Sequence, residues 1–281
     1  MITRNPMQLK ALVKNLAKEK GLSAQLVMQN YMLERLLERI SLSRYRSNFI
    51  LKGGFLIASI VGLDTRATMD LDTTVKGFTL TLDAARETFI EICRIPVEDD
   101  VSFEVLDCAD IRDTDEYPGI RVSLRAVYLT LSVPLKVDVT TGDRITPAEI
   151  EYELPLLFDD RKISVLAYNL ETILAEKIET ILSRGIANTR PRDFYDVYVL
   201  RSLRKKKYRP KILKQALDET AKKRGSTVIL QQYETILQAI ESDAQMNNFW
   251  AKYREEFSYA KDIEFAQTCA AVRELCRESQ A

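Results

Sequence analysis

The chain has 281 residues, 46% of them hydrophobic, and its 41 lysines and arginines balance 41 aspartates and glutamates. This composition excludes a disordered chain, and the absence of long apolar runs argues against a membrane span or a signal peptide, so we expect a cytoplasmic protein. The sequence contains no histidine, so acid–base or metal chemistry has to use carboxylates, lysine, tyrosine or cysteine.

Hydrophobic periodicity predicts where the helices and strands lie. Helical spacing predicts a helix over about 7–20, ended by Gly21, and Ser23 is placed to cap a second helix. A period of two marks strands around 69–74, 121–126 and 135–140, with a helix over about 82–94. Further helices are expected near 170–184, 192–204, 209–224, 227–241, 245–257 and 262–278. We therefore expect a domain over 1–168 and an all-helical domain over 169–281, although a single compact unit is also consistent with the absence of a linker.

The balanced net charge hides blocks of one sign. Residues 1–52 carry ten basic and three acidic side chains, and residues 184–224 carry fourteen and four. Residues 83–116 have the opposite bias, with three basic and twelve acidic side chains. Such blocks often belong to solvated helix faces, but the two basic regions could also bind a polyanion such as RNA or DNA.

A tandem glycine is the first local signal. Gly53 and Gly54 follow Lys52 inside an apolar stretch, in a chain with only nine glycines. Two glycines let the backbone approach a ligand closely, and a helix starting here would direct free N–H groups and its positive dipole end at a phosphate. A plain tight turn is the simpler alternative.

Three aspartates form the second signal. Asp70 and Asp72 are two residues apart in an alternating segment, so on a strand both would project from one face. Asp138 is the only acid of another alternating strand. Carboxylates brought together repel one another unless a cation lies between them, and oxygen ligands without histidine favour Mg²⁺ or Mn²⁺. The four cysteines form no CxxC pair that would indicate zinc. Exposure of both aspartates on an edge strand is the alternative.

Lys177 and the segment after it are the third signal. Lys177 lies on the apolar side of its predicted helix, where an ammonium group needs a partner or a route to solvent. Asp193 and Asp196 follow Pro191 in the first turn of the next predicted helix, where capping alone could explain them.

The order of these residues resembles the AbiEii/AbiGii-type nucleotidyltransferase toxins, a branch of the DNA polymerase β-like nucleotidyltransferase superfamily. The residues that carry the resemblance are Lys52-Gly53-Gly54, Arg66, Asp70-Leu71-Asp72, Asp138, Lys177-x-Glu179 and Arg192-Asp193-x-Tyr195-Asp196. The resemblance implies an α+β fold with a polymerase β-like core, a mixed sheet, N-terminal helices and a helical C-terminal half. It also implies a toxin of a bacterial toxin–antitoxin or abortive-infection system that protects against phage.

The resemblance further implies roles for single residues. The toxin would transfer a nucleoside monophosphate from an NTP, either GTP or a pyrimidine NTP, with Mg²⁺ or possibly Mn²⁺ as cofactor; the acceptor would be RNA, such as the 3′ end of tRNA, and the partner a co-encoded antitoxin. Asp70, Asp72 and Asp138 would bind the metal ions. The NTP would contact Lys52, Gly53, Gly54, Arg66 and Lys177. Lys177 and Asp193 would complete the catalytic set. Many superfamily members have Gly-Ser where this chain has Gly-Gly.

Three alternatives remain open at this point. Asp70 to Thr74 also matches the DxDxT motif of haloacid-dehalogenase-type phosphatases, but the residues before it are not the apolar strand which that motif follows. The transferase could act on a protein hydroxyl instead of RNA. The chain could also be a non-catalytic NTP-binding module on the same scaffold.

Overall fold

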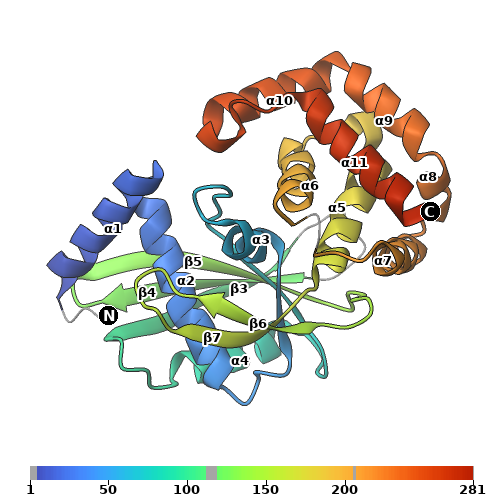
Figure 1. Ribbon diagram of the computed structural model, residues 1–281. Helices are drawn as coiled ribbons and strands as arrows, with labels where there is room; N and C mark the ends of the chain where they lie inside the picture. Colours follow the sequence, from blue (N-terminus) through green and yellow to red (C-terminus); the bar gives the residue numbers. More distant parts are fainter. Residues whose placement is uncertain (1–4, 112–118, 205–206, 281) are drawn as a thin grey trace. The chain divides into compact units, whose positions relative to one another are not determined.

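The computed structural model describes residues 5–111, 119–204 and 207–280 (Figure 1). The chain separates into two compact units. The first contains the chain up to Asp143 together with Ile150–Ala167, and the second contains Arg144–Glu149 and the chain from Tyr168 onward. The functional division into domains over 1–168 and 169–281 remains a prediction, and each compact unit is described by itself.

Two helices lead into the first unit, as the sequence predicts. Helix α1 (Pro6–Lys20) begins with Pro6 in its first turn and ends at Gly21, whose φ of +64° is the left-handed conformation that favours glycine. Helix α2 (Ala24–Leu42) is capped by Ser23, whose side chain accepts a hydrogen bond from the Leu26 N–H.

A mixed sheet forms the body of the first unit. In the described residues it has seven strands in the order β3-β4-β5-β2-β1-β7-β6. Their bounds are β1 (Phe49–Lys52), β2 (Leu71–Val75), β3 (Val101–Ile111), β4 (Gly119–Tyr128), β5 (Leu131–Thr141), β6 (Ile150–Pro155) and β7 (Lys162–Ala167). The pairs β1–β7 and β2–β5 are parallel, and the remaining pairs are antiparallel. The three alternating segments predicted from the sequence correspond to β2, β4 and β5.

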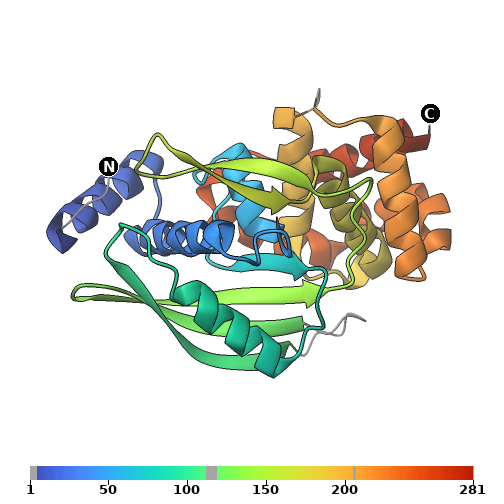
Figure 2. The same cartoon turned by 90° about the horizontal axis from the view of Figure 1, so that it is seen from below.

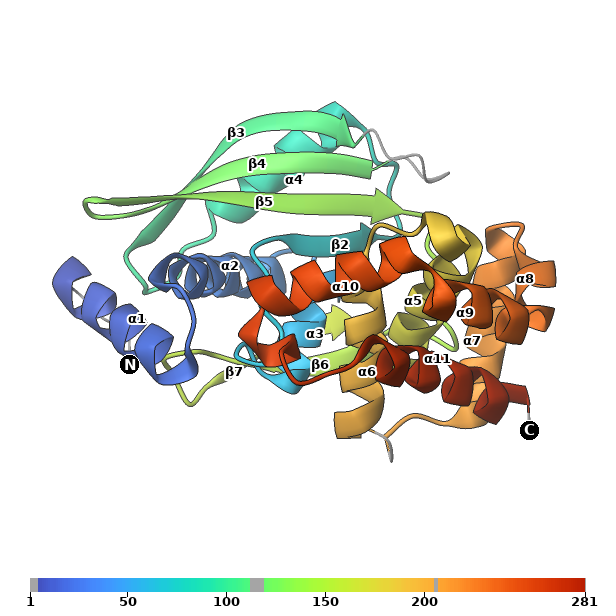
Figure 3. The ribbon, with the colours of Figure 1, turned by 90° about the horizontal axis from the view of Figure 1, so that it is seen from above.

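Alternation along these strands separates an apolar face from a polar one. Leu71, Val122 and Val137 are cross-strand neighbours and are fully buried, whereas Asp72 and Asp138 beside them are only partly buried. Helices α2 and α4 (Leu82–Cys93) lie across one face of the sheet (Figure 2). Helix α3 (Gly53–Val61) lies on the other side, against β1 and β2 (Figure 3).

The second unit is helical in its described part. Its helices are α5 (Leu170–Arg184), α6 (Pro191–Arg204), α7 (Pro210–Lys223), α8 (Thr227–Gln231), α9 (Tyr233–Ser242), α10 (Ala244–Glu256) and α11 (Phe265–Gln280). The bounds follow the predicted ranges closely, with one correction: the helix expected over 227–241 is two helices. The break lies at Gln232, and because neither glycine nor proline marks it, the hydrophobic pattern runs through it without a signal.

These observations confirm an α+β fold with a mixed sheet, N-terminal helices and a helical C-terminal half. None of the helices in the described ranges has the length and apolar character needed to cross a membrane.

Candidate functional site

Strand register places four charged residues in one row across the sheet. Lys52 pairs with Asp72 between β1 and β2, Asp72 pairs with Asp138 between β2 and β5, and Asp138 pairs with Arg121 between β5 and β4. Directly paired residues project from the same face of a sheet, and neighbouring strands lie about 4.8 Å apart. The row therefore runs cation, carboxylate, carboxylate, cation, and it contains two of the three predicted aspartates.

The tandem glycine is packed against Asp72. Gly53 has a φ of +66°, and a Cβ atom added to it would lie 2.1 Å from Oδ2 of Asp72. The backbone N–H of Gly54 donates to the same oxygen at 3.3 Å. A side chain at either position would force its neighbours to shift, because a Cβ atom on Gly54 would also lie 2.9 Å from the hydroxyl oxygen of Thr68. The glycines thus permit helix α3 to begin in direct contact with a carboxylate of the row.

Asp138 is held by an arginine that the sequence analysis did not select. Nε of Arg121 donates to Oδ1 of Asp138 and Nη2 donates to Oδ2, both at 2.7 Å. This hydrogen bonding raises the pKa of Arg121, against the effect of burial, and the negative charges of Asp138, Asp70 and Asp72 add to the increase. All three predicted metal-binding carboxylates therefore act on one guanidinium group.

Lys52 is paired with a second unpredicted residue. Its ammonium group lies 2.5 Å from Oδ2 of Asp143, which also accepts a hydrogen bond from the Thr140 hydroxyl at 2.9 Å. Burial opposes ionisation of Asp143, but the charge of Lys52 and the hydrogen bonds from Lys52, Thr140 and Thr74 outweigh it and lower the pKa of Asp143 to about 2.

Asp70 lies at the end of a loop that α2 anchors. Asn30 donates its side-chain N–H to the carbonyl of Thr68 at 2.7 Å, and Gln29 donates to the carbonyl of Met69 at 2.9 Å. Asp70 is exposed and precedes β2. A DxDxT phosphatase needs its first aspartate after a buried strand, so this position argues against that alternative.

Arg66 is buried, with 2% of its surface exposed, and its guanidinium donates to the carbonyl of Ala67. A Cβ atom on Gly54 would lie 3.2 Å from Nη2 of Arg66. Arg66 therefore lies behind the glycine turn, and its contact with an NTP stays a prediction.

The donor chemistry of the row fits a hard divalent cation. Asp72 and Asp138 are neighbouring oxygen donors on one face, Asp70 lies close in the chain, and the carboxylates already attract a cationic group, the guanidinium of Arg121. In the arrangement described, however, no three acidic or thiol side chains of the described ranges converge to hold an ion. Asp72 and Asp138 therefore supply the kind of oxygen donors that a divalent ion prefers, and Arg121 occupies both oxygens of Asp138.

Lys177 and Asp193 form a separate cluster in the second unit. The ammonium group of Lys177 lies 2.5 Å from Oδ1 of Asp193 and 2.9 Å from Oδ2 of Asp196, and Nε of Arg190 lies 3.0 Å from the other oxygen of Asp193. Both aspartates are buried, whereas Arg192 is exposed. Lys177 and Arg190 together thus balance the charge of two buried carboxylates, and the contact of Lys177 with phosphate stays a prediction.

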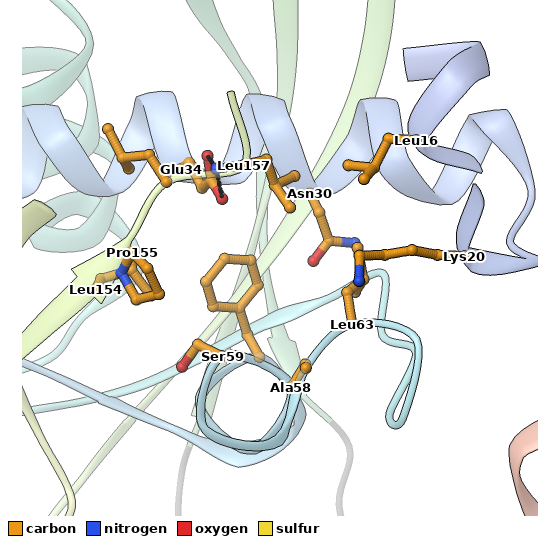
Figure 4. A pocket seen from close by; sticks show the side chains of 13 residues that line it. Leu16, Lys20, Asn30, Glu34, Ala58, Ser59, Leu63, Leu154, Pro155 and Leu157 are labelled. Carbon is orange, nitrogen blue, oxygen red and sulfur yellow. Dashed lines mark hydrogen bonds between the residues drawn. The ribbon is translucent and has the colours of Figure 1, made fainter. Parts of the chain in front are cut away.

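A cavity of about 230 Å³ lies elsewhere in the first unit (Figure 4). Leu16, Asn30, Glu34, Phe55 and Leu157 are among its lining residues, and none of the aspartates of the row lines it. Both carboxylate oxygens of Glu34 accept the Leu157 N–H, at 3.2 and 3.1 Å. Burial raises the pKa of Glu34 to about 8, even though the Leu157 N–H and the charge of Arg35 act in the opposite direction.

Sequence analysis missed Arg121, Asp143 and Glu34. The alternation of β4 places Arg121 on the polar face, but its register with Asp138 depends on the turn at Leu129 and Thr130, which has no glycine or asparagine. The sequence carries no signal that pairs Asp143 with Lys52, 91 positions away.

Comparison with known proteins supports the resemblance stated above. The profile of the family described as "Nucleotidyl transferase AbiEii toxin, Type IV TA system" matches residues 35–272. No curated protein matches the chain. Two crystal structures from Helicobacter pylori, one of a candidate nucleotidyltransferase and one of the protein JHP933, align with 92% of this chain and with 96% and 94% of their own. Their sequence identities are 15% and 16%, and both TM-scores are 0.49.

Proposed function

We propose that this chain, which belongs to the AbiEii family of nucleotidyltransferase toxins of type IV toxin–antitoxin systems, transfers a nucleoside monophosphate from an NTP to RNA. The observation that carries the proposal is the direct register of Asp72 and Asp138 on two parallel strands beside the glycine turn. A co-encoded antitoxin is the partner that the family implies.

The proposed site uses carboxylates where other enzymes use histidine. Asp70, Asp72 and Asp138 would hold Mg²⁺ or Mn²⁺, and the bound ion would neutralise the triphosphate and favour ionisation of the attacking hydroxyl. Asp138 would accept the proton of that hydroxyl. A bond then forms between the acceptor oxygen and the α-phosphorus while the bond from this phosphorus to the bridging oxygen breaks, so that pyrophosphate leaves.

Other residues of the chain would bind and orient the nucleotide. The turn at Gly53 and Gly54 would allow phosphate oxygens to approach the backbone, and Lys52 would offset their charge. In the second unit Lys177 would contact phosphate, as the family resemblance implies. The ion pair between Lys177 and Asp193 supports a role for Asp193 in holding the ammonium group. Positioning and charge neutralisation are the main sources of rate in phosphoryl transfer.

Exposed lysines support RNA as the acceptor. Lys10, Lys14 and Lys18 are exposed at four-residue intervals, which places them on one face of α1 about 6 Å apart. Phosphate contacts of this kind bind nucleic acid without reading its sequence. Because such contacts do not identify the RNA, the tRNA 3′ end as acceptor rests on the family resemblance alone. The assay described next decides between GTP and a pyrimidine NTP as substrate.

A labelling assay tests the function directly. The protein is incubated with Mg²⁺, total bacterial RNA and each labelled NTP in turn, and we expect label on a small RNA with one of the NTPs. Asp72→Asn should reduce labelling more than about 100-fold, because one metal carboxylate is lost. Asp110→Asn, an exposed aspartate of β3, is the matched control and should label as well as the unaltered chain.

The alternatives give different results in the same assay. Label on a protein band would show that the acceptor is a protein hydroxyl and not RNA. Failure to label any macromolecule, together with intact NTP binding by Asp72→Asn, would make the chain a non-catalytic nucleotide-binding module.

A further inference from the structure

We propose that Arg121 is a built-in counter-cation of the metal-binding carboxylates: its guanidinium holds Asp138 in the metal-free protein and has to release it before a divalent ion binds there. Arg121 would thus be a positioning residue that competes with the metal ion. The inference rests on the proposed function, because it takes Asp138 to be a metal ligand.

The geometry of the ion pair gives the first argument. Both oxygens of Asp138 accept hydrogen bonds from one planar guanidinium, at 2.7 Å each. Two-point, charge-assisted contacts of this kind are among the stronger hydrogen bonds of proteins. A divalent ion needs the same oxygens at about 2.1 Å and would be repelled by the guanidinium charge. Arginine and ion therefore compete for Asp138.

A second ion pair on the same strand differs from this contact. Arg125 lies four residues further along β4 and meets Glu104 through one contact of 3.2 Å between two exposed side chains. Arg121 instead makes two contacts of 2.7 Å with a carboxylate that is only 17% exposed, and it also lies in the field of Asp70 and Asp72. The Arg121–Asp138 pair thus lies at the candidate metal site.

Release of Asp138 is physically feasible. The Arg121 side chain is 42% exposed, so its guanidinium can move into solvent without leaving a cavity in the core. An arginine on the polar face of a sheet loses little packing when it changes rotamer. Asp138 itself stays in place on β5, flanked by the buried Val137 and Val139.

Direct measurement of Mn²⁺ binding tests the inference without an activity assay. Free Mn²⁺ is followed by electron paramagnetic resonance with the full chain at low salt. Arg121→Gln should bind Mn²⁺ about fivefold more tightly, which is the affinity gained when an ion pair worth about 1 kcal/mol no longer has to break. Arg121→Lys, which keeps the charge but loses the two-point contact, should lie between Arg121→Gln and the unaltered chain.

The matched control is Arg125→Gln, which removes the same charge from the same strand and should leave Mn²⁺ affinity unchanged. If it tightens binding as much as Arg121→Gln does, general electrostatic attraction explains the effect and the inference is wrong. Unchanged or weaker binding by Arg121→Gln would equally overturn it.

The Asp138→Asn background separates this inference from the proposed function. There Arg121→Gln should tighten Mn²⁺ binding no more than Arg125→Gln does, because the shared ligand is gone. If Asp138→Asn alone binds Mn²⁺ as tightly as the unaltered chain, the metal role of Asp138 fails, whatever Arg121 does. If Asp138→Asn weakens binding while Arg121→Gln changes nothing, the proposed function survives and the role of Arg121 does not.

Discussion

Substitution of Glu34 by glutamine should remove most of the pH dependence of stability between pH 5 and pH 8. Burial raises the pKa of Glu34 from 4.5 to about 8. The folded state therefore keeps a proton that the unfolded state loses. The contribution of Glu34 to the free energy of unfolding is therefore fully present below pH 4.5 and is lost as the pH rises through 8.

The size of the effect follows from these two values. Between pH 5 and pH 8 the free energy of unfolding should fall by about 3–4 kcal/mol in the unaltered chain, and it should stay nearly constant in Glu34→Gln. Because the chain has no histidine, no imidazole group titrates between pH 5 and pH 8. Three of the cysteine thiols do not titrate between pH 5 and pH 8, since burial raises the pKa of Cys93 to about 11 and those of Cys269 and Cys276 to about 12.

Urea unfolding at pH 5, 6.5 and 8 measures the difference. The glutamine keeps one oxygen that can accept the Leu157 N–H, so the local structure should persist. Glu104→Gln, at an exposed position of β3, is the control and should show the same pH dependence as the unaltered chain. Equal losses of stability in the unaltered chain and in Glu34→Gln would refute the reasoning, because Glu34 would then ionise near its ordinary pKa.

Two further substitutions test the candidate site. Gly53→Ala should lower the free energy of unfolding at least about 1 kcal/mol more than Gly21→Ala, because both glycines have positive φ but only at Gly53 would the new Cβ atom meet Asp72; equal losses in urea unfolding would contradict the contact. Lys177→Met should cost about 3–5 kcal/mol, since it leaves the buried carboxylates of Asp193 and Asp196 without their shared ammonium group; an unchanged melting temperature would show that Arg190 suffices.

Local sequence signals predicted the helices well. Gly21 and Ser23 act within one turn of the helix they end or begin, so the bounds of α1 and α2 follow from the residues themselves. Strands were harder to predict. Strand β1 is only four residues long, and only Lys52 and the two glycines separate its apolar residues from those of α3. Such short apolar segments show no period that distinguishes strand from helix.

The partners of the site residues could not be predicted from local patterns. Alternation placed Asp72 and Asp138 on polar faces, but their register comes from a parallel pairing of strands 66 positions apart, which the whole fold determines. Arg121 reaches Asp138 across a tight hairpin at Leu129 and Thr130, a turn without the residues that normally mark one. The sequence thus predicted which residue types carry the chemistry, but it did not predict which residues lie next to them in space.

The row from Lys52 to Arg121 shows how the sheet tolerates two adjacent carboxylates. Asp72 and Asp138 face each other on neighbouring strands, and like charges at such positions destabilise a sheet. The sheet offsets this repulsion with a guanidinium on one side, bound to Asp138, and with the Gly54 N–H and the nearby Lys52 on the other. These groups are the chain's own, so the sheet offsets the repulsion between the two carboxylates without depending on a bound cation for folding.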